Sequence, residues 1–537
     1  MKLTSKLIVV LLVICLGALC FVACNAKNET PSTPTSTTVD TVVIGTTAVI
    51  EKAVRGEYNY EMLSSGNSDI PLVYKDTDGA YHPLLASYTT TDSKTWTFTV
   101  VDGMKWSDGV DVTAEDILFT LQQEDKVGEG KTYTSAVVSS DKKSIALTLP
   151  SVNLRALADL TYFRTMPKHI YEGKTEEQIT EADGRVVCGP YVLESFNKDA
   201  GTLTFVQNQY YPNKPNVNKI VFQLFDQADV MYLALAAGDL DSVWAYSVGV
   251  PQTYASILKD AKDIVLETAP QENAPAVLMF DNHSAPFNNA DLRNAISYAL
   301  DYSKFVEVFG GATASIPNRG FAPNATFGFK ETEKLGQNLT KADELMQKAG
   351  YAKNSDGKYA KDGAVFEFDL SVTATNAQHV RYAELVKTQL EAFGIKVNID
   401  SLDVLSFRIK TTNKFSGDND TTVAYQAAIN GFTAAGMGMI NGFGSIYVDK
   451  NHAVQGCCQV DNEEFNGILA EMAAADTPEK YFAGSAKLQD YYATATPLLA
   501  LYWDAVGYAH TANLEGWVID ATFGINNVNT WMNLKTK

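Results

Sequence analysis

Polar and apolar residues alternate in some stretches of the chain and recur with helical spacing in others. Residues 95–100 read Thr-Trp-Thr-Phe-Thr-Val, an alternation that is typical of a half-buried strand. Residues 107–109 (Ser-Asp-Gly) then predict a turn. Residues 113–116 (Thr-Ala-Glu-Asp) resemble a capping box, so they predict the start of a helix whose apolar residues share one face.

Four further helices follow from spacing and end signals. Apolar residues recur at i, i+3, i+4, i+7 and i+8 over 292–300, which indicates an amphipathic helix. Residues 340–343 predict the start of a helix that stops at Gly350, and residues 384–393 predict one that ends at Gly394, before a strand. Thr477 with the proline after it predicts another start. Strand and helix signals alternate without an internal repeat, so we expect an α/β or mixed α+β fold.

Length and composition restrict the class of protein. At roughly 100–200 residues per domain, 537 residues correspond to two to four domains. Only 20% of the residues are charged and Tyr and Phe are abundant, so most of the chain can bury a core. The net charge of −20, with no run of Lys or Arg, argues against nucleic-acid binding.

The first residues have the features of an export signal. Lys2 and Lys6 precede an uncharged apolar run over 7–23, which is short for a spanning helix and typical of a signal peptide. The run ends in Phe-Val-Ala before Cys24, which resembles a bacterial lipobox. This implies a signal peptide over 1–23 and a lipid on Cys24. A signal anchor and a plain secretory signal are the alternatives.

The segment that follows predicts a tether. Residues 30–38 are only Ser, Thr and Pro, a composition that stays extended, so we assign 24–40 as a flexible connection to the body. Loss of Lys2 and Lys6 with the signal changes the net charge from −20 to −22. We expect a body outside the cytoplasm, anchored to the cell membrane by lipid, on the periplasmic side if an outer membrane is present.

Neither a metal site nor a catalytic set is visible. Of the mature body's cysteines, Cys188 stands alone, and Cys457 and Cys458 are either a vicinal disulfide or, as we favour, two buried thiols. The six histidines lack ligand spacing. There is no G-x-S-x-G, H-E-x-x-H or G-x-G-x-x-G, and the P-loop-like stretch 127–132 has Asp125 at the first glycine position. We therefore expect no enzyme, no cofactor and no metal.

Five blocks, in order along the chain, resemble one family. Residues 96–122 resemble its "DGxxWSDGxxxTAxD" signature, and residues 188–191 read Cys-Gly-Pro-Tyr. Residues 235–241 resemble its "L-x-x-G-x-x-D" helix end, residues 291–301 its "D-x-R-x-A-I-x-Y-A-x-D" helix, and residues 384–397 its "G-I-x-V" region. The chain thereby resembles the family 5 extracytoplasmic solute-binding proteins of ABC importers for peptides and nickel.

The resemblance implies a periplasmic-binding-protein-like fold of two lobes with a ligand cleft between them. The first lobe is expected over 41–268 plus 496–537, with a subdomain at about 61–184, and the second over 269–495. Hinge closure would trap the ligand. The implied partners are an ABC permease and its ATPase, and we expect a monomer.

The resemblance also suggests ligand-binding residues. Arg381 lies where the family's dipeptide binders hold a carboxylate, although it could be a solvated helix residue. The family's amine-binding Asp is missing, since no carboxylate occurs over 431–447. That loss disfavours a free ammonium group and leaves a flexible apolar wall, although the methionines could instead fill the core. His283 could face the cleft or a metal chelate, or be an ordinary surface residue. The candidates in the wall are Asn430, Gly431, Phe432, Thr433 and Met437.

Three functional hypotheses follow. The first is a lipid-anchored receptor that binds a peptide or a similar small polar solute and delivers it to the permease. The second is a receptor for a metal chelate such as nickel, or for an oligosaccharide, which the missing Asp favours. The third is an adhesin or signalling lipoprotein that keeps the fold without transport.

Overall fold

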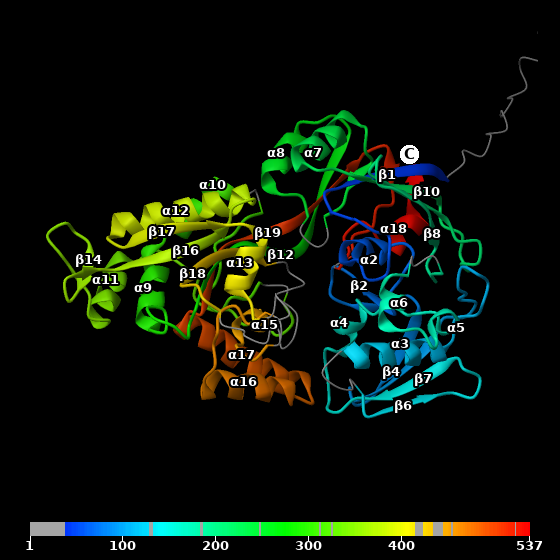
Figure 1. Cartoon of the computed structure of the whole chain (residues 1–537), viewed down its shortest axis with the longest axis horizontal. Coiled ribbons are helices and arrows are strands. Elements are labelled where there is room, and N and C mark those ends of the chain that lie inside the picture. Colours follow the sequence, from blue (N-terminus) through cyan, green and yellow to red (C-terminus); the bar gives the residue numbers. More distant parts are fainter. Residues whose placement is uncertain are drawn as a thin grey trace, which may run out of the picture.

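The chain folds into two lobes that lie side by side. The computed structural model describes residues 38–127, 133–182, 186–245, 249–310, 313–323, 326–413, 423–432, 444–452, 455–520 and 522–537. In Figure 1 the first lobe combines the blue, cyan and green part of the chain, as far as α8 (Gln252–Lys259), with its red end, and the second lobe runs from lighter green to orange. The mixed α/β architecture confirms the predicted fold class. The predicted signal peptide, Cys24 and nearly all of the tether lie outside the described residues.

One ten-stranded sheet passes through both lobes in the order β17-β16-β18-β12-β19-β11-β1-β10-β9-β8. Its centre is the long antiparallel pair β12 and β19, which runs from Ile264 opposite Thr511 to Met279 opposite Leu498. This pair connects the lobes. The strands are β1 (Val39–Thr46), β8 (Tyr191–Asn197), β9 (Thr202–Gln207), β10 (Val217–Leu224), β11 (Ser242–Val243), β12 (Ile264–Phe280), β16 (Glu367–Thr373), β17 (Lys396–Leu402), β18 (Ala427–Phe432) and β19 (Leu498–Thr511).

The first lobe adds a four-stranded sheet, β4-β5-β7-β6, against which α3 packs. Its strands are β4 (Ala86–Thr90), β5 (Thr95–Val100), β6 (Ser135–Val138) and β7 (Ser144–Thr148), with the short pairs β2 (Val73–Lys75), β3 (Tyr81–Pro83), β20 (Leu514–Glu515) and β21 (Lys535–Thr536). Its helices are α2 (Tyr58–Ser64), α3 (Ala114–Val127), α4 (Ala156–Leu160), α5 (Lys168–Tyr171), α6 (Glu176–Thr180), α7 (Ala228–Ala237), α8 (Gln252–Lys259) and α18 (Val528–Asn533).

In the second lobe, helices cover both faces of the sheet. An outer cluster contains Leu278 of β12 and residues of α9 (Ala290–Ala299), α10 (Tyr302–Phe309), α11 (Leu339–Lys348) and α12 (Ala377–Phe393). An inner cluster contains Val277 and residues of α13 (Val404–Thr411), α15 (Ser445–Val448), α16 (Glu463–Ala473) and α17 (Pro478–Ala495). Successive strand residues point to opposite faces, which explains how one strand serves both clusters. A small sheet is formed by β13 (Ala352–Lys353), β14 (Tyr359–Lys361) and β15 (Ala364–Val365).

Local sequence signals explain most helix starts. The carboxylate of Asp116 accepts hydrogen bonds from the backbone N–H and the hydroxyl of Thr113, at 2.8 and 3.1 Å, as the capping pattern predicts. The hydroxyl of Thr477 caps α17 as expected. Two starts were misplaced. Asn338 caps α11 two residues before the predicted Thr340, and α12 begins at Ala377, seven residues before the predicted 384, because the Asn376 side chain caps it.

The buried Arg293 explains one block of the resemblance. Its guanidinium donates to the carbonyls of Ala495 and Thr496, at 2.6–3.1 Å, and to that of Phe287. Helix ends expose carbonyl groups without partners inside the helix, so a cation fits there. Arg293 thereby joins α9 to the end of α17, just before β19 returns toward the first lobe.

The boundaries between the lobes, predicted at 269 and 496, stay predictions. Leu498 to Trp503 belong to the two clusters of the second lobe. We therefore propose that the second crossing lies nearer Asp504 than Thr496. Cys457 and Cys458 are free and buried, which confirms the reading as thiols. Among the described residues, no helix has the length and apolar character needed to cross a bilayer.

Candidate functional site

Three tyrosines lie on elements of the two lobes that face each other (Figure 1). Tyr58 begins α2 and Tyr162 follows α4 in the first lobe, while Tyr447 lies in α15 of the second. Burial raises the pKa of Tyr447, and the charges of Cys457, Tyr58 and Tyr162 add to this rise. The pKa of the Tyr447 hydroxyl therefore responds to groups on both lobes. We call these residues the interlobe tyrosines.

The second lobe presents an aromatic wall at this point. Phe432, the last residue of β18, stacks on Tyr447 with ring centroids 3.8 Å apart and planes 12° apart. Phe321 meets Phe432 edge-on at 6.2 Å and lies 5.5 Å from Trp503. Phe321, Phe432 and Trp503 are buried in the inner cluster. The wall is thus a continuation of the core.

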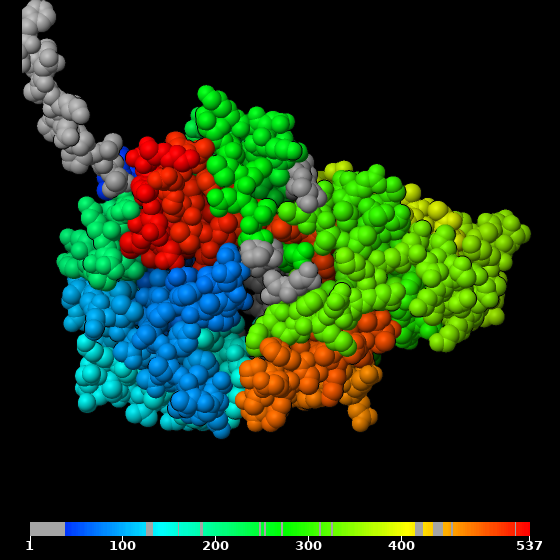
Figure 2. All heavy atoms as spheres, turned by 180° about the vertical axis from the view of Figure 1, so that it is seen from behind, coloured from blue at the N-terminus to red at the C-terminus, as the bar shows by residue number. Residues whose placement is uncertain are grey.

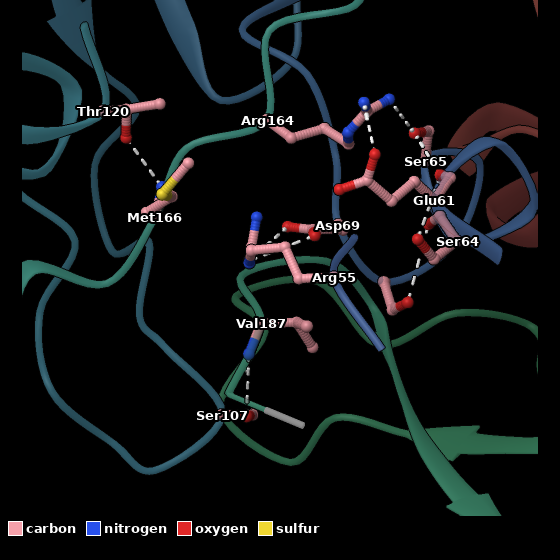
Figure 3. Close-up of polar contacts among 11 residues, drawn as sticks. Arg55, Glu61, Ser64, Ser65, Asp69, Ser107, Thr120, Arg164, Met166 and Val187 are labelled. Carbon is pink, nitrogen blue, oxygen red and sulfur yellow. Dashed lines mark hydrogen bonds and ion pairs between the residues drawn. The ribbon is translucent and has the colours of Figure 1, made fainter. Parts of the chain in front are cut away.

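The first lobe presents a charged wall. Arg164 pairs with Glu61 of α2 at 3.1 Å and donates to the Ser65 hydroxyl at 3.2 Å; Figure 3 shows its side chain directed at both. The side chains of Arg164 and Glu61 are 16% and 20% exposed. Burial raises the pKa of Glu61, and the charge of Arg164 opposes this rise. The pair is therefore mostly buried, yet part of each side chain is exposed to a solute.

A second ion pair lies next to the first, also in Figure 3. Arg55 pairs with Asp69 at 3.2 Å, and their side chains are only 4% and 7% exposed. The Arg55 guanidinium also lies 5.5 Å from the ring centre of Tyr171. A solute cannot reach this pair, so its role is to hold the lobe together.

Cations from both lobes flank Tyr58. The side chain of Tyr58 is 61% exposed. Partial burial raises the pKa of its hydroxyl, while the charges of Arg164 and of Arg408, on α13 of the second lobe, lower it. Figure 1 shows α13 and α2 on the sides of the two lobes that face each other. Arginine binds carboxylates through paired N–H groups, so this arrangement suits an anionic group.

Three predicted residues lie at one end of β18, beside the aromatic wall. Asn430 and Gly431 are half-buried, and Phe432 contributes through its stack on Tyr447. A Cβ on residue 431 would lie 2.9 Å from the carbonyl oxygen of Pro275, so glycine allows the two strands to approach. Thr433 and Met437 lie outside the described residues.

The other two predicted ligand-binding residues, Arg381 and His283, are not grouped with the residues at the end of β18. Arg381 is exposed on α12, with its guanidinium 5.2 Å from the ring centre of Phe309. Its role as a carboxylate ligand stays a prediction. His283 is exposed beyond the end of β12 where Phe280 pairs with Ala427, whereas Phe432 is at the other end of β18. The two ends are five residue steps apart along the strand, roughly 17 Å, so His283 is not grouped with the others.

The sequence prediction did not name the residues of the two facing walls: Tyr58, Tyr162, Arg164, Arg408 and Tyr447. It also missed His379, near Gly431, whose Nδ1 has no hydrogen-bond partner and whose pKa is lowered to about 4 by burial. None of these residues lies in a recognisable motif, and only the abundance of tyrosine hinted at them. Within the described ranges, no three His, Cys, Asp or Glu side chains converge as a metal site would require.

Comparison with known proteins gives a consistent result. A family model described as "Bacterial extracellular solute-binding proteins, family 5 Middle" matches residues 80–447. The nickel-binding periplasmic protein of Escherichia coli is 26% identical over 347 residues, 61% of this chain and 64% of that protein. The oligopeptide-binding protein OppA of Bacillus subtilis is 23% identical over 471 residues, 81% of each chain. The first two relatives are matched over less than two thirds of their length, 64% and 47%.

Solved structures show the same fold. NikA from Brucella suis, in complex with Fe(III)-EDTA, has a TM-score of 0.78 at 17% identity, covering 93% of this chain and all of that one. AppA from Bacillus subtilis, in complex with a nonapeptide, has a TM-score of 0.73 at 18% identity, covering 93% and 99%. These likenesses confirm the two-lobe, periplasmic-binding-protein-like architecture predicted from the sequence.

Proposed function

The chain belongs to family 5 of the bacterial extracellular solute-binding proteins, and we propose that it is the lipid-anchored receptor of an ABC importer. It binds a carboxylate-bearing solute, a peptide or a metal chelate, between its lobes and delivers it to the permease. The observation that carries this proposal is that α2 of one lobe, which carries Tyr58 and pairs with Arg164, faces α13 and α15 of the other, which carry Arg408 and Tyr447 (Figure 1).

Closure follows from this shared site. A solute that contacts both walls binds the closed arrangement more tightly than the open one, and so shifts the population toward closure. The solutes of two relatives have the required chemistry, since NikZ of Campylobacter jejuni was solved with Ni(L-His) and AppA with a nonapeptide. Histidine and peptides both carry a carboxylate, which an arginine can bind at either wall.

Calorimetry tests the proposal. The mature chain is titrated with a tripeptide-to-nonapeptide pool and with Ni(L-His), and small-angle scattering follows closure. We expect binding in one of these two arms, and a loss of at least about tenfold in affinity for Arg164→Met and for Arg408→Met, equal to about 1.4 kcal/mol. Lys304→Met, an exposed cation on α10, is the control and leaves affinity unchanged.

A titration with mannohexaose separates the remaining candidate. A relative from Thermotoga maritima was solved with mannohexaose bound, which keeps an oligosaccharide in consideration. An oligosaccharide has no charge for the arginines to hold. Binding of mannohexaose alone, unaffected by either arginine variant, would overturn the carboxylate assignment. A receptor that ignores all three solutes would favour a role in adhesion or signalling.

Anchoring at Cys24 is a separate part of the proposal. The apolar run and the residues before Cys24 support it. Cys24→Ala in the full chain should move the protein from the membrane fraction to the soluble fraction, and mass spectrometry should find diacylglycerol only on the parent chain. An unmodified Cys24 on a membrane-bound parent chain would instead indicate a signal anchor.

A further inference from the structure

A loop of the first lobe reaches into the second. The loop connects β7 to α4 and carries Leu154 and Arg155 near its end. Leu154 packs against the inner cluster of the second lobe, and burial raises the pKa of Tyr481 on α17, a rise that the charge of Arg155 opposes. We propose that Leu154 and Arg155 form an interlobe latch that stabilises the closed arrangement even without a ligand.

The loop is held in shape by its own lobe. The N–H of Asn153 donates to the Ser93 carbonyl at 2.8 Å, and the N–H of Leu149 donates to that of Lys94 at 2.9 Å. The Asn153 side chain then accepts from the N–H of Arg155 at 2.9 Å. Contact with the other lobe therefore needs little further ordering of the backbone, which keeps its entropic cost low.

The receiving surface is also rigid. Tyr481 lies in the first turn of α17 and is buried in the inner cluster. Its ring is 5.2 Å from that of Phe327, which is 47% exposed, and the ring of Phe482 lies 5.0 Å from Phe327 and 6.4 Å from Tyr481. An aromatic surface of this kind can take up an aliphatic side chain such as Leu154 and lose it again without unfolding.

Charge within the first lobe favours the same contact. Lys75 of β2 lies near Arg155, and its pKa is lowered, first by burial and then by the charge of Arg155. Two neighbouring cations repel each other, which favours positions of the Arg155 guanidinium away from Lys75. Figure 2 shows the blue and cyan part of the first lobe directly against the orange α16 and α17 region.

The latch is separate from the interlobe tyrosines. It would set the fraction of receptor molecules that are closed before a ligand binds. A receptor whose closed form is populated before binding has a higher apparent affinity, because less of the ligand's binding energy is used to close it. The latch would therefore determine affinity without contacting the solute.

The test uses the mature chain after its ligand has been removed. Leu154→Ser combined with Arg155→Gln should increase the radius of gyration in small-angle scattering and raise amide exchange in the first turn of α17 at least fivefold. Val137→Ser, at a 62% exposed position of β6 in the same subdomain, is the control and should change neither.

Two outcomes separate the latch from the proposed function. An unchanged radius and unchanged exchange in the double variant would overturn the latch, whatever the receptor binds. Failure of every solute titration would overturn the ligand assignment but leave the latch measurement intact, since that measurement contains no solute. Far-ultraviolet circular dichroism confirms that each variant is folded. Arg155→Gln alone, which keeps Leu154, should increase the radius of gyration and the amide exchange less than the double variant does.

Discussion

The two walls that face each other between the lobes are built by different physical means. The wall of the first lobe is held by ion pairs, Arg164 with Glu61 and, behind it, Arg55 with Asp69. The wall of the second lobe is held by stacked and edge-on aromatic rings that continue into the inner cluster. Charge pairs can be altered at the surface with little loss of stability, whereas the rings cannot be removed without opening the core.

The comparison suggests that the two walls have different roles, one in choosing the solute and the other in stability. The charged wall can change which solute is bound, because exposed charges set electrostatic complementarity. The aromatic wall fixes the shape of the second lobe, because its rings are packed on more than one side. A substitution at the back of either wall should therefore affect stability, and one at the front of the charged wall should affect binding.

The largest expected effect is at the back of the charged wall. Asp69→Asn leaves the Arg55 cation buried without its partner, so the free energy of unfolding should fall by about 3–5 kcal/mol. Urea unfolding measures the loss. Asp111→Asn, at a well exposed ion pair, is the control and should change it by less than about 1 kcal/mol. Equal losses in the two variants would show that the Arg55–Asp69 pair is not structural.

The next effect is in the aromatic wall. Phe321→Ala removes a fully buried ring that contacts Phe432, Tyr492 and Trp503, and should cost about 3 kcal/mol. The value lies at the lower end for such changes because the wall borders the interlobe surface and can relax. Phe327→Ala, at an exposed ring, should cost clearly less in the same urea assay. The reverse order would mean that the aromatic wall is independent of the core.

One carboxyl group of the first lobe, that of Asp520, should make the stability of the protein depend on pH. Asp520 is buried and accepts from the N–H groups of Thr522 and Phe523, at 2.6 and 2.8 Å, yet burial raises its pKa from 3.8 to about 6. The folded state thus holds this proton more tightly than the unfolded chain does. The stability that Asp520 contributes is complete below pH 3.8 and is lost as the pH rises through about 6.

Asp520→Asn should remove that loss. At pH 7 the variant should be more stable than the parent chain by on the order of 1–3 kcal/mol, and the difference should vanish near pH 4. Thermal unfolding over pH 4–7 measures it. A variant that is less stable at pH 7 would show that the carboxylate is stabilised where it lies.

Local signals in the sequence predicted local structure well. The alternation over 95–100 became β5, and the Thr113 and Thr477 patterns became helix starts, since a strand face or a cap depends on neighbours in the chain. Asn338 was overlooked as a cap because the pattern at Thr340–Asp343 offers a competing start two residues later, and Asn376, which caps α12, was not recognised either. The family blocks predicted the two lobes, although their residues are mostly structural, as Arg293 shows.

The candidate site could be predicted only in part. Phe432 was named because its segment departs from the family pattern; the structure places it in an aromatic stack with Tyr447, and its role in binding stays a prediction. Tyr58, Arg164 and Arg408 come from segments that are up to 350 residues apart, and nothing in a short window indicates that they meet. Their approach depends on how β12 and β19 place the lobes, which is a property of the whole fold.

The smallest expected effect is at the front of the charged wall, where Arg164 and Glu61 are partly exposed. In a double-mutant cycle of Arg164→Gln and Glu61→Gln, the coupling in unfolding free energy should be about 1–2 kcal/mol, below the loss at Asp69, because these side chains are 16% and 20% exposed and water screens them in part. Burial raises the pKa of Glu61, so neutralising this residue relieves part of its desolvation and further reduces the net cost. The same Arg164→Gln chain should nevertheless lose at least tenfold in affinity for the carboxylate solute. A coupling as large as that of the Arg55–Asp69 pair, with unchanged affinity, would make both pairs structural and leave the first lobe without a binding wall.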